Sequence, residues 1–173
     1  MKKILIALLL IIIAAGGFFF YMSIDQYDKS QYSASTSKGF ERGSFMKFKL
    51  PNPSDKDVFL DSSILKLIVV FEKEQGHMFT EYLASKPKDF MKSKYAMLVL
   101  DITKIPVAVR NTFVLPTLRS NSYPTALIPN DKLANVFKDP VNGDKIHIIS
   151  VINNRVMSIE FASTKEELDK ILK

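Results

Sequence analysis

The sequence contains no cysteine and no tryptophan, and only two of its 173 residues are histidine. The absence of cysteine excludes disulfide bonds, thiolate nucleophiles, cysteine-ligated zinc or iron–sulfur clusters and a lipid-modified cysteine. Two histidines leave little room for a histidine-based metal site. We therefore expect neither a metal nor another cofactor in this protein.

Charge of one sign is not concentrated anywhere in the chain. The 24 Lys+Arg and 18 Asp+Glu give a formal net charge of +6, and the two signs are interspersed. Nucleic-acid binding needs a basic stripe with stacking aromatic residues, which this pattern does not supply. We expect no nucleic-acid partner, while affinity for acidic surfaces such as lipid headgroups stays open. The length allows one ordinary domain.

The longest apolar run covers residues 4–22 and carries no charge. Such a run predicts a transmembrane helix, and we assign residues 1–22 to an anchor in the membrane. Lys2 and Lys3 precede the run, and the first residues of opposite charge come after it. The positive-inside rule then predicts a single-pass protein of the bacterial inner membrane, with a cytoplasmic N-terminus and a periplasmic C-terminal domain.

A cleaved secretory signal is the alternative for the same run. The small residues at positions 14–17 would form the cleavage region. The aromatic residues at positions 18–21 then follow, and they fit an interfacial belt better than the start of a mature chain. We favour retention of the segment.

Residues 23–44 are rich in serine, glycine and charge, with no sustained periodicity. This composition predicts a flexible periplasmic stalk. A strap that binds a partner through Tyr27, Tyr32 and Phe40 is the alternative. The remaining residues, 45–173, are assigned to one domain.

Two apolar runs in this domain, at residues 65–71 and 96–100, predict strands buried on both faces. A helical pattern at residues 77–91 lies between them, with Pro87 breaking or kinking it. Strand, helix and strand in this order form a βαβ unit, so the two strands should be parallel neighbours with a right-handed crossover.

The rest of the domain predicts a short helix, a strand, a long excursion rich in turns, a hairpin and a closing helix. Asn153 and Asn154 supply the turn of an antiparallel hairpin. Ser163 and Glu166 have the spacing of a capping box at the start of the closing helix. In chain order the segments are residues 105–118, 125–128, 129–145, 146–152, 156–161 and 163–172.

This order of elements resembles the thioredoxin fold over residues 58–173. The segment 121–128, with its Tyr123-Pro124-Thr125, is similar to the place where thioredoxins put a cis-proline before a strand. Residues 100–106 are similar to a strand exit of that family. The resemblance implies an α/β, thioredoxin-like three-layer sandwich with a mixed sheet, preceded by a single N-terminal transmembrane helix.

The chain departs from the family at residues 72–79, where thioredoxins carry Cys-x-x-Cys. Without a thiol the chain cannot perform thiol–disulfide exchange by itself, so we expect a redox-inactive, non-enzymatic member. Glu72, Glu74 and His77 lack a recognised metal spacing, and a solvated loop is the favoured interpretation. His147 lies in the middle of a predicted strand, where a packed histidine is the default.

The candidate residues for partner binding lie in two segments. Their rationale is that an edge near the proline could accept an extended peptide, with the loop after the first strand beside it. Exposed aromatic or apolar contacts are also expected at Phe113, Phe137 and Val141. The candidates are Glu74, Gln75, Gly76, His77, Tyr123, Pro124 and Thr125.

Two non-enzymatic functions are considered beside that of an enzyme. The first is a non-enzymatic scaffold or interaction subunit of a bacterial envelope machine, for example a flagellar motor or a secretion assembly. Its partners would be other envelope proteins and, through residues 4–22, the inner membrane. The alternative is a peptide-binding or chaperone-like module that holds extended client segments.

Overall fold

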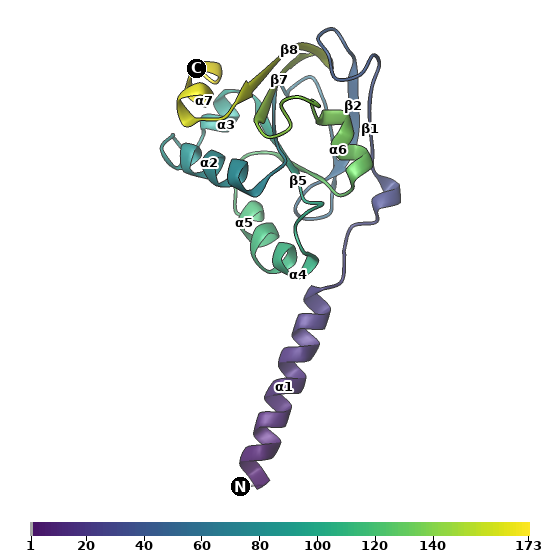
Figure 1. Cartoon of the computed structure of the whole chain (residues 1–173), viewed down its shortest axis with the longest axis vertical. Helices are drawn as coiled ribbons and strands as arrows, with labels where there is room; N and C mark the ends of the chain where they lie inside the picture. The colour runs from purple at the N-terminus through teal and green to yellow at the C-terminus, as the bar shows by residue number, and fades with distance from the viewer. Residues whose placement is uncertain (1) are drawn as a thin grey trace.

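The computed structural model describes the backbone of residues 2–173 and the side chains from Ala7 onward. A long helix, α1, projects from a domain formed by the rest of the described chain (Figure 1). The domain contains a three-stranded sheet of order β1-β2-β3 and a five-stranded sheet of order β6-β5-β4-β7-β8. The strands are β1 (Ser33–Thr36), β2 (Met46–Pro51), β3 (Asp57–Phe59), β4 (Lys66–Val70), β5 (Ala96–Asp101), β6 (Thr125–Ile128), β7 (Ile146–Ile152) and β8 (Arg155–Ala162). The helices are α1 (Lys2–Met22), η1 (Lys29–Gln31), α2 (Lys73–Ala84), α3 (Phe90–Ser93), α4 (Val107–Val109), η2 (Arg110–Val114), α5 (Leu115–Arg119), α6 (Asp131–Phe137) and α7 (Lys165–Ile171).

The predicted βαβ unit is confirmed. β4 and β5 are parallel neighbours, with Val69 opposite Val99. Both strands are almost wholly buried because each lies inside the sheet with a packed layer on either face. The predicted helical stretch is broken around Pro87, as expected, into the two helices α2 and α3.

The predicted hairpin is also confirmed, since β7 and β8 pair antiparallel. Its turn places Asn153 and Asn154 at φ of 48° and 63°, the left-handed region that asparagine tolerates better than most residues. The N-cap of the closing helix α7 lies one residue after Ser163, the residue predicted to cap it. Thr164 is the N-cap, and its hydroxyl accepts a hydrogen bond from the Glu167 N–H at 3.2 Å.

The five-stranded sheet is covered on both faces, which gives the three layers of the domain (Figure 1). Helices α2, α3 and α7 pack on one face, where side chains such as Ile68 and Phe79 form an apolar cluster. The three-stranded sheet and α6 pack on the other face, around Met46, Phe48 and Phe137. The α/β class and the mixed sheet are thus confirmed, although a second sheet supplies much of one outer layer.

Backbone hydrogen bonds join the two sheets directly. The Gly43 N–H donates to the Val156 carbonyl at 2.8 Å, and the Val156 N–H donates to the Ser44 carbonyl at 2.9 Å. Phe45 and Arg155 then form an antiparallel bridge. We call this join, residues 43–46 against 154–156, the inter-sheet seam.

The prediction of a membrane anchor is wrong. In the part of the chain that the structure describes, no helix combines the length and the apolar composition that a bilayer crossing requires. This finding overturns the transmembrane assignment of residues 1–22, the transmembrane helix placed before the fold and the contact with the inner membrane through residues 4–22. The single-pass inner-membrane location, with a cytoplasmic N-terminus and a periplasmic domain, falls with it. Met1 lies outside the described residues.

The segment predicted to be a flexible stalk is partly built into the domain. β1 pairs with β2, and the Tyr27 side chain is 4% exposed in a cluster with Leu115 and Leu127. The segment differs from a flexible stalk because a few apolar side chains within its serine-rich sequence pack against residues that are distant in sequence. The bounds assigned to the domain, residues 45–173, stay a prediction.

Candidate functional site

The segment 72–79, at which the sequence resemblance places the thiols of thioredoxins, contains the N-terminus of α2. Gln75 lies in its first turn and is only 5% exposed. Its Oε1 accepts hydrogen bonds from the N–H groups of Phe71, at 2.8 Å, and Glu72, at 3.2 Å. Its Nε2 donates to the carbonyl of Gly143 at 3.5 Å. One amide therefore ties the end of β4 and the loop after α6 to this helix.

An ion pair lies beside this buried amide. Lys104, from the loop after β5, donates to a carboxylate oxygen of Glu72. The hydrogen bond and the charge of Glu72 raise the pKa of Lys104 above its usual value. Since both side chains reach solvent, this pair contributes little to stability. It does place Glu72, the polar group nearest the helix end, in an ionic contact.

His147 lies deeper, on β7, and its side chain has no exposed surface. Nδ1 is 3.0 Å from the Phe137 carbonyl oxygen, and Nε2 is 2.9 Å from the Asn142 carbonyl oxygen. Burial lowers the pKa of His147 below its usual 6.5, although the two carbonyl contacts oppose this by favouring the protonated ring. Aromatic rings surround it at centroid distances of 5.5, 4.9 and 5.0 Å, namely Phe40, Phe71 and Phe161. His147 is thus a packed core residue, as the sequence predicts.

Helix α2 already begins at Lys73, so Glu74 and His77 belong to the helix and not to a loop. Both residues are exposed. The expected strand-to-helix loop is therefore shorter than predicted. Between residues 2 and 173, no group of three or more metal-ligating side chains is found. Glu74, Gly76 and His77 keep their predicted role in partner binding as a prediction.

The second predicted segment, Tyr123 to Thr125, leads into β6. The Tyr123 hydroxyl accepts a hydrogen bond from Asn121 Nδ2 at 2.8 Å, and burial raises the pKa of Tyr123. The Pro124 carbonyl accepts from the Leu98 N–H at 3.0 Å, and Thr125 is buried. Part of the backbone that was expected to be available to a peptide is thus already paired within the sheet.

The strand order contradicts the predicted equivalence of Pro124 with the cis-proline position of thioredoxins. β6 is an outer strand parallel to β5, and β7 is the strand that runs antiparallel beside the central β4. Pro124 therefore lies one strand beyond β5 rather than beside β4. All peptide bonds of the described chain are trans.

The structure does not bring the two predicted segments together. Val70, the last residue of β4, is level with Leu100, near the end of β5. Thr125, the first residue of β6, is level with Leu98, nearer the start of β5. The first turn of α2 thus lies at the carboxyl ends of the parallel strands, and the Tyr123 segment lies at their amino ends. The Ser122 hydroxyl donates to the Lys88 carbonyl at 3.2 Å, next to the far end of α2.

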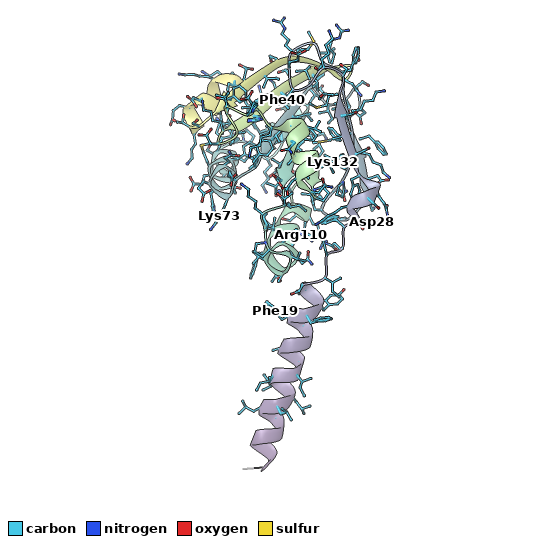
Figure 2. The ribbon with its side chains drawn as sticks, turned by 45° about the vertical axis from the view of Figure 1, so that its right-hand side comes forward. Phe19, Asp28, Phe40, Lys73, Arg110 and Lys132 are labelled. Carbon is cyan, nitrogen blue, oxygen red and sulfur yellow. The ribbon has the colours of Figure 1, made fainter. Side chains whose placement is uncertain are left out.

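A polar junction that the sequence analysis did not find connects α1 to the domain. Arg110, in the π-helical turn η2, is 3% exposed and forms an ion pair with Asp25 at 2.5 Å. Its guanidinium also lies over the Tyr27 ring, 5.2 Å from the centroid. Asn111 Nδ2 donates to the carbonyls of Met22 and Ile24, both at 2.9 Å. We call these six residues the α1 junction; Figure 2 labels Arg110 near the point where α1 meets the domain.

The electrostatics of the α1 junction favour the ion pair. Burial raises the pKa of Asp25, but the Tyr27 N–H and the Arg110 guanidinium outweigh it and hold this pKa below its usual value. Burial also raises the pKa of Tyr27, to about 12. A single arginine inside the apolar stretch of residues 105–118 was the one sequence signal for this junction. Its partner, 85 residues away, gave no such signal.

Comparison with solved structures finds thioredoxin-like proteins at low sequence identity. A protein from Bacteroides thetaiotaomicron described as a protein disulfide isomerase is 15% identical, with a TM-score of 0.47, and the match covers 81% of this chain and 89% of that one. The thioredoxin domain of a thiol-disulfide oxidoreductase from Bacteroides vulgatus is 14% identical, with a TM-score of 0.42, over 82% and 100% of the two chains. The mitochondrial 2-Cys peroxiredoxin of Plasmodium falciparum is 12% identical, with a TM-score of 0.41, over 78% and 89%.

No protein-family model matches this chain, and no curated protein matches it. Its assignment to the α/β class with a mixed sheet therefore rests on its own strand order and pairing. This chain has no cysteine, so thiol–disulfide chemistry by its own residues does not fit its composition.

Proposed function

We propose that this protein is a non-enzymatic interaction scaffold built on a redox-inactive, thioredoxin-like domain. The observation that carries the proposal is the closure of the α2 N-terminus by Gln75, which binds three backbone groups where a redox enzyme would expose a thiol. These hydrogen bonds have structural value, but an amide engaged in this way offers no reactive group to a substrate.

The neighbouring titratable groups support the same conclusion. Glu72 is engaged by Lys104, and His147 has no exposed surface from which to exchange a proton with a substrate. General acid–base catalysis requires a group within hydrogen-bond reach of the reacting atom. The buried His147 does not meet that requirement, and at Glu72 the Lys104 ammonium group competes with a substrate for the carboxylate.

The α1 junction supports a scaffold role in a different way. Arg110 and Asn111 hold the end of α1 and the following residues against the domain through an ion pair and two hydrogen bonds. A chain joined by such contacts presents α1 and the domain in a defined relation, which a spacer between partners needs. A flexible linker would leave that relation undefined.

Purification of the tagged full-length chain from its own cells, after crosslinking in the intact cell, tests the proposal. We expect a defined partner to co-purify in constant ratio with the wild type. The same ratio is expected for the exposed-surface control Glu74→Ala, and a lower one for Arg110→Ala. A free monomer without any crosslinked partner would contradict the scaffold role. So would a turnover activity that is lost on replacing Glu72.

A further inference from the structure

The outer face of the three-stranded sheet differs from its inner face in chemistry. Along β2, Met46, Phe48 and Leu50 point into the core, so the alternate residues point outward. Lys47 and, one position before the strand, Phe45 are on this outer face, and the Phe45 side chain is 46% exposed.

A hollow of about 520 Å³ lies on this face, between the end of the β1–β2 pair and the tip of the β7–β8 hairpin. Its lining consists of hydroxyl and amide groups, one ammonium group and one aromatic ring, with no carboxylate. The lining residues are Ser35, Thr36, Ser37, Phe45, Lys47, Asn153 and Asn154.

The charge of the hollow is positive and uncompensated. The Arg155 guanidinium lies 4.7 Å from the centroid of the Phe45 ring, which keeps a second cation at the edge of the hollow. Lys49 is paired with Asp57 at 3.1 Å. Within the described part of the chain, neither Lys47 nor Arg155 forms a salt bridge. Two cations on this face therefore have no anionic partner from the chain itself.

We propose that this hollow binds an extended acidic segment of a partner protein. Carboxylates of the segment pair with Lys47 and Arg155, and an apolar side chain of the segment packs on Phe45. The hydroxyl groups at Ser35 and Ser37 and the amide of Asn153 are placed to bond the polar backbone of the segment. The inference rests on the proposed scaffold function, because it names the surface and the partner chemistry of that role.

Charge complementarity selects an acidic protein segment over the other occupants. The described lining supplies one cation, hydroxyls and amides without a carboxylate, and Arg155 lies at its edge, so a basic segment would meet repulsion. A purely apolar helix would leave Lys47 and the hydroxyl groups without partners, which costs free energy. A second copy of this chain, with its net charge of +6, would also bring like charge to the site.

The test is a binding titration followed by fluorescence anisotropy. The probe is a labelled peptide in which glutamates flank a single phenylalanine, and a matched peptide with lysines is its control. We expect saturable binding of the acidic peptide at low salt that weakens as salt screens the charges, and no binding of the basic peptide. Lys47→Glu should weaken binding by about tenfold, since it removes one ion pair and adds a repulsion.

Matched variants separate this surface from general charge and aromatic effects. Lys92→Glu makes the same change of charge on α3, on the opposite face of the five-stranded sheet, and should bind like the wild type. Phe45→Ala should lose affinity, whereas Phe113→Ala, another exposed phenylalanine, should not. Equal effects of Lys47→Glu and Lys92→Glu, or no binding at low salt, would overturn the proposal.

The scaffold function can stand or fall separately. If Lys47→Glu and the wild type co-purify the same partner in the same ratio, the hollow is not the docking site, while the scaffold role stands. If no partner co-purifies but the acidic peptide binds through Lys47, the hollow stands and the scaffold role fails. A dimer seen by light scattering that Lys47→Glu dissociates would show a second copy on this face and overturn the acidic segment as its occupant.

Discussion

The side chain of Gln75 forms hydrogen bonds with three backbone groups. Without it, each of these groups would face the apolar interior or a loop without this hydrogen-bond partner. The N–H groups of Phe71 and Glu72 lie at the end of β4, where the sheet can no longer pair them. An amide has both an acceptor and donors, so it can also bind the Gly143 carbonyl. A carboxylate or an alkyl chain at this position could not satisfy all three groups.

Replacing Gln75 with alanine should lower the free energy of unfolding by about 1–3 kcal/mol, because two buried N–H groups lose their acceptor. Chemical denaturation of the full-length chain measures this change. Glu74→Ala, at the exposed neighbouring position of the same helix, is the control and should change the stability little. A Gln75→Ala variant as stable as the control would show that the amide does not close the helix start.

His147 makes the stability depend on pH. Because burial lowers its folded-state pKa, the folded protein keeps the ring neutral at pH values where the unfolded chain is already protonated. The unfolded state then binds more protons, and stability decreases as the pH falls below about 6.5. Asp139 works against this shift, and Lys138 adds to it.

Thermal unfolding between pH 8 and pH 5 measures the effect. We expect a falling unfolding midpoint for the wild type and for His77→Gln, which removes only an exposed ring. His147→Phe should be less stable throughout, since one backbone carbonyl loses the single N–H donor of the neutral ring, but its midpoint should depend less on pH over the same interval. If the midpoint of His147→Phe depended on pH as strongly as that of the wild type, the pH dependence would come from carboxylates and not from His147.

At the scale of elements, the π-helical turn η2 positions Arg110 beneath the chain that follows α1. A π-turn adds a residue to the helical repeat, and such turns occur often at functional positions. Here Arg110 is directed at Asp25 and Tyr27, and the next residue, Asn111, contacts the end of α1. The arrangement fixes a segment whose composition alone predicts flexibility.

Arg110→Ala should release this segment. The change leaves Asp25 partly buried without its cation and removes the contact with Tyr27, so we expect a loss of about 2–3 kcal/mol in stability. Hydrogen exchange should become faster at residues 24–36, which include β1. Arg42→Ala, at an exposed arginine outside the junction, is the matched control. Unchanged exchange in this segment would show that the α1 junction does not hold it.

The elements differ in how far the sequence determines them. The βαβ unit and the β7–β8 hairpin could be predicted, because dense apolar runs and the Asn153-Asn154 turn are local signals. The partner of β6 could not, since its four residues fit a parallel or an antiparallel neighbour equally well. Sequence periodicity also missed the three-stranded sheet, whose strands are short and interrupted by polar residues.

The candidate site was predictable only in part. Gln75 was among the residues named in advance, yet its role as a buried cap depends on Gly143, 68 residues away. The separation of Tyr123 from the first turn of α2 follows from strand order, which the resemblance to thioredoxins suggested incorrectly for Pro124. The prediction of a membrane anchor relied on one apolar run and was contradicted.

At the scale of the whole molecule, the apolar interior of the domain contains no side chain from the described part of α1. The three described clusters of buried residues begin at Tyr27 and draw on both sheets and on helices from α2 onward. The chain after α1 should therefore fold without it, whereas the segment from Tyr27 to β1 belongs to the packed structure.

Two truncations test this division. Removal of residues 1–22 should leave the thermal unfolding midpoint of the domain nearly unchanged, because the truncation exposes little of the core. Removal of residues 1–36 should destabilise it by about 3–5 kcal/mol, since Tyr27 and β1 are lost together. Circular dichroism and heat denaturation provide the measurement. Equal midpoints for the two truncated chains would show that the fold does not depend on residues 23–36.

The inter-sheet seam has a mechanical consequence. Because the backbone at Gly43 and Ser44 is bonded to Val156, a pull applied to the first strands travels into the hairpin and from there to the central strand. The two segments of the seam are antiparallel, so a force applied through α1 and through the C-terminus acts on the bond between Gly43 and Val156 first and reaches the bond between Met46 and Asn154 last. Stretched in an optical trap from α1 to the C-terminus, the seam should therefore open one bond after another at low force.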